Sequence, residues 1–469
     1  MSLLLLSTVV TSSLAHRPPT LKRQGNDGVR TWQQQAAIQD PIEECTPYDY
    51  PPVSNIIHTY PPVWDIADLS NPNIDPEVIA LFNKINASIP NIPIKGSPDG
   101  QWFGGYDGVA DPDCWWTYTG CTTPKIKSLP TDVTQCNEPK SWGLTLDDGP
   151  NCTHNAFYDF LQQNNQTASL FYIGSNVLDW PLEAQRGFAM SNTLNAHTYS
   201  HHYMTGLTNE QAFAELYFSK KAIKDVVNVT VRAWRPPFGD VDDRIRFIAQ
   251  ALDMKTIVWS EDTDDWNWVN LGVPKIESNY KSIIGQVDTK YTQSGAIVLT
   301  HELNNETMSL VEEFYPQIKT SWTGGVMPYE VCMNITTPYL ETEGYVYPNY
   351  EQYMSGTRTI QLSAPTALGT GQILQFASIS TNQTSSRSNS AVMTSITSST
   401  MIPTSSMTSS NGDTTSKSKS GSMTASAANQ SKTPITSSNT KDHNGSQSQT
   451  ATFGTMFAIL FSIILACTL

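Results

Sequence analysis

The chain is 469 residues long, enough for two or three ordinary domains, and its formal net charge is −15. Since contact with a phosphate backbone requires a basic surface, this acidic balance argues against a nucleic-acid partner. The composition also changes along the chain. Beyond about residue 375 Ser and Thr dominate, and such a segment cannot bury a hydrophobic core.

The first 15 residues have the pattern of a secretory signal peptide, because an apolar run after Ser2 is followed by small residues up to Ala15. We therefore expect a secreted protein that is cleaved after Ala15. Residues 16–136 are rich in Pro, Trp and Tyr and have few helical periods, which predicts an extension that wraps the following domain. Its rings would pack on that domain or reach a binding groove; they include Trp102, Tyr106, Trp115 and Trp116.

Residues 137–335 alternate short apolar runs with amphipathic helical segments. Ser169–Ile173 and Ala296–Leu299 have the composition of buried strands, and Thr208 with Gln211 forms a capping pair at the start of a helix. This alternation predicts an α/β fold in which crossover helices connect parallel strands.

Two adjacent carboxylates, Asp147 and Asp148, follow the apolar run Trp142–Leu146 and precede the turn Gly149–Pro150. A strand that ends this way brings both side chains to the rim of a sheet or barrel, where ligands bind. Ionising both of these carboxylates costs free energy unless a cation or a strong hydrogen bond separates their roles. The pattern indicates one metal ligand and one general base; the alternative is an acidic loop at a strand end.

Two imidazoles, His197 and His201, lie four residues apart, so on a helical turn they would share a face and could hold one ion. An Asp with two His leaves positions open for water and substrate, as catalytic metal sites do. Surface helices also carry such pairs without a metal. We expect His154 and His202 to be solvent-facing or structural.

Five short motifs follow one another along the chain. They are Thr145–Pro150, His197–His201, Arg235–Gly239, Asp262–Trp266 and Ile297–His301. In residues and in order this set resembles the motifs of the polysaccharide deacetylase family, the NodB-like carbohydrate esterases. The flanking segments Tyr60–Trp64 and His301–Asn305 look like those of fungal chitin deacetylases. The resemblance implies a distorted (β/α) barrel with the motifs at strand ends.

The resemblance also implies roles for single residues. Asp148, His197 and His201 would bind a divalent metal, zinc with cobalt able to substitute, which polarises an acetyl carbonyl and activates water. Asp147 would be the general base, and Arg235 would pair with it and keep it ionised.

His301 matches the family's general acid, and Asp262 matches the carboxylate that raises the pKa of that imidazole. Trp266 and Leu299 match residues that wall an acetyl-methyl pocket, although buried apolar side chains are more often simply core. Phe238 stands where the family has Tyr; there the backbone N–H, rather than the side chain, would help to hold an oxyanion.

Asp264, Asp265 and Trp268 receive no role and are expected to be loop residues. Leu146 and Glu302 also depart from the family pattern, and these departures bear on substrate preference rather than on catalysis.

Seven cysteines are present, and Cys467 lies in the apolar C-terminal tail. Six cysteines in a secreted chain predict three disulfides, whose connectivity the sequence leaves open. Because Cys136 and Cys332 bracket the motif-bearing region, we expect those two to pair. The six are Cys45, Cys114, Cys121, Cys136, Cys152 and Cys332.

Residues 336–375 are interpreted as a C-terminal extension of the domain, and residues 376–444 as an O-glycosylated stalk. Residues 445–469 have the layout of a GPI-attachment signal with Asn444 as the anchor; the alternative is a transmembrane span, which would favour basic residues beyond it. N-glycosylation motifs lie at Asn86, Asn165, Asn228, Asn305, Asn334, Asn382 and Asn429, and also at Asn151 beside Asp148.

Together these patterns predict a monomeric, secreted enzyme that is GPI-linked to the plasma membrane or to cell-wall glucan and acts on chitin. With a zinc or cobalt ion it would hydrolyse N-acetyl groups and produce chitosan and acetate. Two alternatives remain. One is the same hydrolysis on another acetylated glycan, such as peptidoglycan or xylan, and the other is a non-catalytic, carbohydrate-binding wall mannoprotein.

Overall fold

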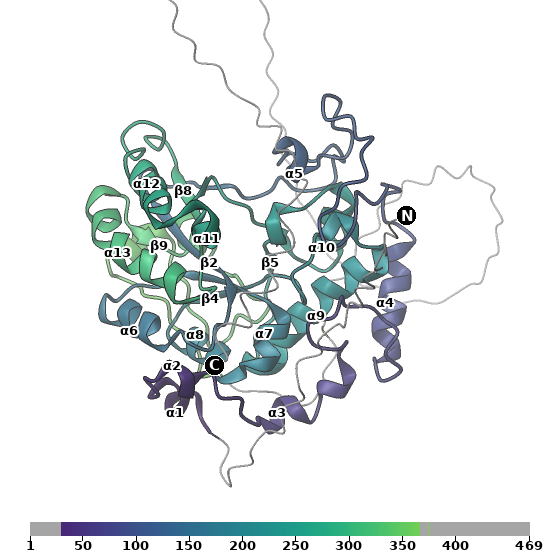
Figure 1. The fold of residues 1–469 in the computed structure, drawn as a ribbon, viewed down its shortest axis with the longest axis horizontal. Helices are drawn as coiled ribbons and strands as arrows, with labels where there is room; N and C mark the ends of the chain where they lie inside the picture. The colour runs from purple at the N-terminus through teal and green to yellow at the C-terminus, as the bar shows by residue number, and fades with distance from the viewer. Residues whose placement is uncertain (1–29, 366–373, 375–469) are drawn as a thin grey trace, which may run out of the picture. The chain divides into compact units, whose positions relative to one another are not determined.

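The structure, a computed structural model, describes residues 30–365 and residue 374 (Figure 1). The predicted signal peptide, the stalk, the GPI-attachment segment with Asn444, the motifs at Asn382 and Asn429, and Cys467 lie outside the described residues. Within the described part of the chain, none of the helices has the length and apolar character needed to cross a bilayer.

A curled sheet of mostly parallel strands forms the centre of the domain (Figure 1). β2 (Trp142–Gly149) lies between β8 (Gly295–His301) and β3 (Ser169–Tyr172). The order continues from β3 through β4 (Thr193–Ala196), β5 (Ala233–Trp234) and β6 (Lys255–Thr256). Two further strands pair parallel: β7 (Glu261–Asp262) with β8, and β9 (Val326–Met327) with β2. β1 (Gln135–Cys136) pairs antiparallel with β8.

The two edges of this sheet come together. A parallel bridge joins Val133, which precedes β1, to Ile257, which follows β6. The sheet therefore curls into the distorted (β/α) barrel that the sequence predicts. Both predicted buried strands are present, as β3 and as the middle of β8.

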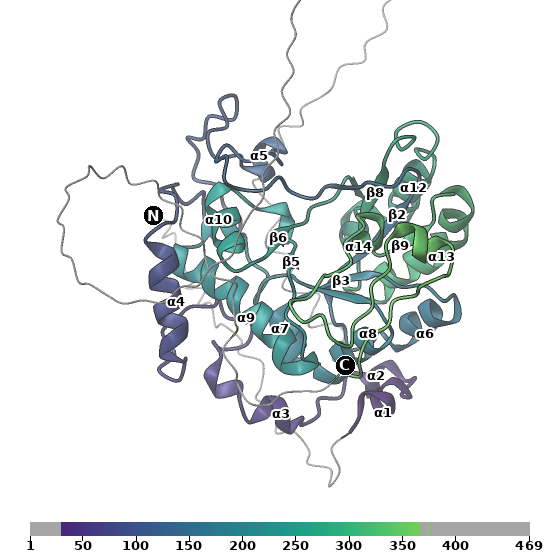
Figure 2. The ribbon, with the colours of Figure 1, turned by 180° about the vertical axis from the view of Figure 1, so that it is seen from behind.

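Helices cover the outside of the sheet in both views (Figures 1 and 2). The longest is α9 (Asn209–Val227), and it begins at the predicted capping pair, in which the Thr208 side chain accepts from Gln211 N. The other helical segments are α1 (Trp32–Ala36), α2 (Pro41–Glu44), α3 (Pro51–Ser54), η1 (Ile57–Thr59), α4 (Pro76–Asn86), α5 (Trp116–Thr119), α6 (Asn155–Gln163), α7 (Gly174–Asp179), α8 (Pro181–Ala189), η2 (Met204–Gly206), η3 (Pro237–Gly239), α10 (Asp243–Ala251), η4 (Asp265–Asn267), α11 (Trp268–Leu271), α12 (Val273–Ile284), α13 (Asn305–Ser321), α14 (Tyr329–Cys332) and α15 (Tyr350–Met354).

A buried carboxylate connects neighbouring strands inside the barrel. Glu330 on α14 accepts hydrogen bonds from Ser169 Oγ at 2.5 Å, Thr193 Oγ1 at 2.7 Å and Asn195 Nδ2 at 2.9 Å. Burial raises the pKa of Glu330, and these donors act in the opposite direction. Because the donors come from β3 and β4, the carboxylate holds the start of both strands in register.

Buried hydrogen bonds hold the N-terminal segment against α8 and α9. Tyr60 Oη donates to Asp225 Oδ2 at 2.6 Å, and Ala67 N donates to Glu215 Oε1 at 2.8 Å, both on α9. Tyr48 Oη donates to Glu183 Oε2 on α8. These contacts fix the described part of residues 16–136 to α8 and α9.

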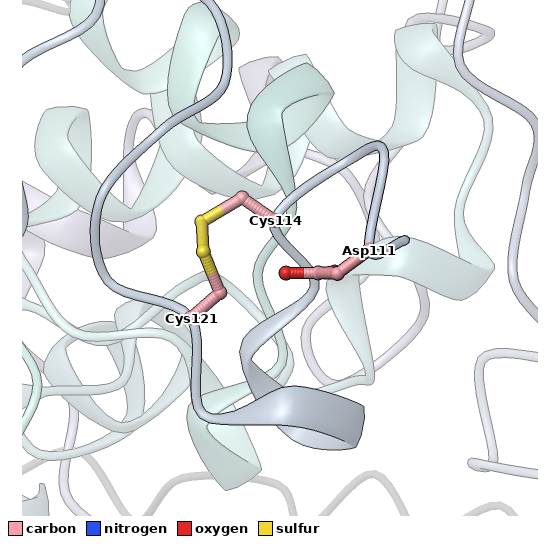
Figure 3. A group of neighbouring side chains, drawn as sticks. All are labelled: Asp111, Cys114 and Cys121. Atoms are coloured by element: carbon pink, nitrogen blue, oxygen red, sulfur yellow. A yellow bond between two sulfur atoms is a disulfide. The ribbon is translucent and has the colours of Figure 1, made fainter. Parts of the chain in front are cut away.

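Three disulfides use the six cysteines named above. Cys45 bonds to Cys152, Cys114 to Cys121, and Cys136 to Cys332, the pair expected from the sequence. Asp111 lies beside the Cys114–Cys121 bond (Figure 3). Since both sulfur atoms are bonded to each other, this group does not offer the thiolates that a metal ion would need.

Candidate active site

The two adjacent carboxylates reach one site because β2 is irregular at its end. Asp147 pairs in register with His301 on β8 and Phe171 on β3, and the β2–β3 register then shifts before Gly149. Asp148 adopts a left-handed conformation with φ of 71°. Since side chains on a regular strand alternate between faces, this bulge-like irregularity is what lets Asp147 and Asp148 both face the site.

Asp148 lies against the two imidazoles of the second motif. Its Oδ1 atom is 3.4 Å from His197 Nε2 and 3.2 Å from His201 Nε2. His197 Nδ1 lies 2.8 Å from the carbonyl oxygen of Arg235. That carbonyl only accepts, so Nδ1 carries the proton and the lone pair of Nε2 points toward the carboxylate.

This arrangement fits a cation. Asp148 Oδ1 is buried and has no hydrogen-bond partner within the described residues. The Nε2 atom of His197 that faces it is also an acceptor, so a cation between the two would satisfy both. Burial alone would raise the pKa of Asp148, but positive charge at the neighbouring imidazoles, chiefly at His201, would hold it well below its usual value, and a bound cation would have the same effect. The ligand atoms of Asp148, His197 and His201 thus lie close enough together for one divalent ion to contact all three, and these residues form a candidate metal site.

Glu215 on α9 shapes the loop that carries the two histidines. Its fully buried carboxylate accepts from Tyr199 N and Ser200 N, both at 2.8 Å, and from Ser200 Oγ. It therefore binds the two residues just before His201, which itself has a left-handed φ of 59°. The sequence motifs carry no signal for Glu215, because the position resembles any other buried position of an amphipathic helix.

Asp147 has a different partner from its neighbour. Arg235 Nη1 donates to Asp147 Oδ1 at 2.6 Å and to Thr145 Oγ1 at 2.9 Å, and its guanidinium lies over the Phe171 ring. Arg235 is fully buried. Asp147 Oδ2 is left facing the metal side, 3.7 Å from His197 Nε2. The structure thus brings Arg235 and Asp147 together as the sequence predicts.

The partner of His301 differs from the prediction. His301 Nδ1 lies 2.6 Å from Asp265 Oδ1, and His301 N donates to Asp265 Oδ2 at 2.9 Å. The assignment of Asp262 to this task is wrong, and so is the expectation that Asp265 is a loop residue without a role. Asp262 lies in β7 and pairs with Leu299, two residues before His301. The chain continues for three more residues past Asp262 before it brings the Asp265 carboxylate to the His301 ring.

The electrostatics agree with this correction. Burial alone would lower the pKa of His301, but the Asp265 carboxylate raises it to about 10. Burial raises the pKa of Asp262 to about 6, whereas Asp265 makes two hydrogen bonds with His301. His301 Nε2 is then the ring nitrogen that is available to donate a proton into the site.

The proposed pocket residues lie around these groups. Leu299 is buried and precedes His301 by two residues on β8, so both side chains point to the same face of the strand. The Trp266 and Phe238 side chains are 47% and 46% exposed, which makes both rings accessible to a ligand. The Phe238 ring lies 4.8 Å from the His201 ring.

Glu302 has a structural role that the sequence does not reveal. It is fully buried and accepts from Asn151 N at 2.9 Å and Tyr158 Oη at 2.7 Å, while its own N donates to Asp147 O at 3.0 Å. His154, predicted to be structural or solvent-facing, is buried and lies 3.4 Å from the same carboxylate. Glu302 therefore fixes the turn that follows Asp148.

The N-glycosylation motifs within the described residues stay predictions. Asn86, Asn165, Asn305 and Asn334 are exposed, and Asn228 is half-buried. The Asn151 side chain donates to Leu303 O at 2.7 Å, a contact that a glycan on that nitrogen would disturb.

A carboxylate and two imidazoles at the ends of parallel strands, beside a second buried carboxylate and a carboxylate-paired histidine, are typical of a metal-dependent hydrolase. Residues 134–257 match the family model of polysaccharide deacetylases. Over 337 residues the chain is 47% identical to Chitin deacetylase 2 of Cryptococcus neoformans var. grubii, with 70% of this chain and 73% of that protein covered. The chain belongs to the polysaccharide deacetylase family.

The chain is also similar to one further fungal deacetylase in sequence and to another in fold. The chitin deacetylase of Amylomyces rouxii is 43% identical over 319 residues, covering 66% of this chain and 74% of that protein. The solved structure of the chitin deacetylase from Colletotrichum lindemuthianum aligns with 45% of this chain and 96% of its own, at 20% identity and a TM-score of 0.42. That structural likeness is too distant to add to the sequence matches.

We predict that Asp265→Asn moves the alkaline limb of the pH profile of kcat/KM to lower pH by about 1 to 3 units. A general acid works while it is protonated, so activity falls as pH rises through the pKa of His301. Loss of Asp265 removes the largest of the charges that raise the pKa of His301. Asp262→Asn is the matched control, and an equal shift in both variants would contradict the assignment of Asp265.

We predict that Glu215→Gln weakens divalent-metal binding by about 10- to 100-fold, because the His201 loop loses its anionic acceptor. The measurement is competition with a chromophoric chelator on folded protein. Glu210→Gln, on the same helix, is the control, since Glu210 accepts from Leu69 N outside that loop. Unchanged affinity in Glu215→Gln would show that the loop keeps its shape without this carboxylate.

Proposed function

We propose that this protein is a chitin deacetylase, which hydrolyses the N-acetyl groups of N-acetylglucosamine residues in chitin and produces chitosan and acetate. One observation carries the proposal: the divided carboxylate pair, in which Asp148 faces two histidines while Asp147 is held by Arg235. The similarity to proteins named chitin deacetylases, at 43–47% identity, supports chitin as the substrate.

The reaction is hydrolysis of an amide, which requires an activated water, stabilisation of the oxyanion and a proton for the departing nitrogen. When bound by Asp148, His197 and His201, a zinc or cobalt ion would supply Lewis-acid polarisation of the carbonyl and the water. Asp147 Oδ2 takes the proton from water, because Oδ1 is engaged by Arg235.

The remaining groups act on the other side of the amide. His301 donates a proton from Nε2 to the leaving nitrogen, since Nδ1 is engaged by Asp265. The Phe238 backbone N–H would stabilise the oxyanion. Trp266 and Leu299 would wall the acetyl methyl group. Water adds to the carbonyl carbon, the C–N bond breaks, and acetate and a free amine result.

The cellular setting is proposed from sequence patterns alone. They support a secreted, monomeric glycoprotein that is attached at Asn444 through a GPI anchor to the plasma membrane and retained at the cell wall. The sequons at Asn86, Asn165, Asn228, Asn305, Asn334, Asn382 and Asn429 would carry N-glycans.

Two other functions are less well supported. A peptidoglycan deacetylase of Listeria monocytogenes is 26% identical over 190 residues, a weaker match than the chitin deacetylases. A non-catalytic, carbohydrate-binding wall protein would not need an ionised ligand, a base and a carboxylate-paired histidine in one site.

Acetate release from N-acetylglucosamine oligomers tests the proposal. The secreted protein, chelated and then reloaded with zinc or cobalt, should regain release that chelation abolished. Asp148→Asn should lose both metal and turnover, whereas Asp147→Asn should retain the metal and lose turnover by about 100-fold or more. Metal loss in both variants would contradict the division of roles, and no release from metal-loaded wild-type protein would refute the proposed activity.

A further inference from the structure

A cluster of aromatic rings stands at the edge of the N-terminal segment. We call Trp102, Tyr106, Trp115 and Tyr118 the aromatic ledge. Trp115 and Tyr118 stack with centroids 5.6 Å apart, and Trp102 packs on Tyr118 at 5.0 Å. Trp115 is buried, whereas Trp102 is 47% and Tyr118 46% exposed. Apolar rings exposed together, rather than singly, are typical of ligand-binding surfaces.

The ledge is fixed to the domain by buried polar contacts. Asp240, which directly follows the Arg235–Gly239 motif, accepts from Trp115 Nε1 at 2.8 Å and Thr117 Oγ1 at 2.6 Å. Arg246 donates to the carbonyl oxygen of Cys114 and to that of Cys121, at the two ends of the disulfide (Figure 3). A surface held this way is ordered before any ligand arrives, which lowers the entropic cost of binding.

The ledge is continuous with the metal-site rim. A Cβ atom on Gly100 would lie 2.5 Å from the Tyr203 ring, so the chain before Trp102 passes in contact with that ring. Tyr203 stacks on Phe238 at 4.0 Å, and Phe238 lies against His201. The rings therefore form a path from a metal ligand to Gly100, two residues before Trp102.

A second contact ties α5, the helix that carries Tyr118 of the ledge, to the same motif. A Cβ atom on Gly239 would lie 2.1 Å from the Trp116 ring, and Gly239 has a left-handed φ of 68°, so only glycine fits there. Trp116 in turn packs on Trp259 at 4.9 Å. Any shift of the ledge would therefore also move the loop that carries Phe238.

We propose that the aromatic ledge, with Trp102 as its exposed ring, is a distal subsite that binds the sugar chain beyond the residue being deacetylated. The inference rests on the proposed function. A polymer bound at the metal site must continue over the rim, and the apolar C–H faces of neutral pyranose rings stack on exposed aromatic rings. Trp102 is a specificity-determining residue that favours longer oligomers, outside the catalytic set.

The test compares kcat/KM on the N-acetylglucosamine dimer and hexamer. Trp102→Ala should lower the value for the hexamer by about threefold to tenfold and leave the dimer within about twofold. Trp102→Phe, which keeps an aromatic ring, should restore most of the loss. Ile42→Ala is the matched control, because Ile42 is 84% exposed on α2, at the opposite end of the domain from α5 in both views (Figures 1 and 2).

A binding measurement separates the ledge from turnover. In the Asp147→Asn background, calorimetric affinity for the hexamer should fall on Trp102→Ala by a similar factor. Equal losses on dimer and hexamer, or no loss on either, would overturn the subsite and leave the deacetylase standing. Absence of metal-dependent release from every oligomer by the wild-type protein would instead overturn the proposed function on which the subsite rests.

Discussion

The site depends on one constraint: two neighbouring carboxylates have different partners, a guanidinium for one and two imidazoles for the other. Asp147 is neutralised by a buried guanidinium, and Asp148 faces two imidazoles, of which His197 is held by the Arg235 carbonyl so that its Nε2 electron pair is directed at the carboxylate. Adjacent carboxylates repel each other when both are ionised and buried, so the protein has to compensate two charges within one turn of chain. Arginine compensates the first, and the donor set around Asp148 suits a divalent cation for the second.

The loops around this pair are positioned by buried polar groups rather than by apolar packing alone. Glu215 holds the backbone before His201, Glu302 holds the turn after Asp148, and Asp240 holds the segment after Phe238. Each carboxylate accepts several backbone or side-chain donors. Burial of such groups is costly unless every partner is present, so each network specifies one loop geometry. The N-terminal extension contributes to this order by docking on the same helices and motifs.

Much of this could be predicted from the sequence because the chemistry is concentrated in short motifs. The alternation of strands and helices, the Asp147–Asp148 pair and Arg235 all give correct expectations of fold or proximity. His197 and His201 do lie together, but on an irregular loop with left-handed residues rather than on the helical turn that their spacing suggests. The choice between Asp262 and Asp265 failed for a geometric reason. Both carboxylates lie within four residues, and only the path of the chain after β7 decides which one meets His301.

Other features carry only a weak sequence signal, as Glu302 and the aromatic rings do, or none, as Glu215 does. Glu215 and Glu302 are single acidic residues, one on a helix and one after a strand, and their role comes from contacts across long sequence separations. The aromatic ledge was foreseeable only as a cluster of rings in an extension. Its continuity with Phe238 depends on how that extension docks, which local patterns do not encode.

The most direct test of the account is X-ray absorption at the metal edge of the cobalt-loaded protein. The structure predicts a first coordination shell with two imidazole nitrogens and one carboxylate oxygen, and one ion per chain. The His197→Ala variant should show one imidazole fewer. A spectrum without imidazole scattering, or one that His197→Ala leaves unchanged, would contradict the claim that Asp148, His197 and His201 form the metal site.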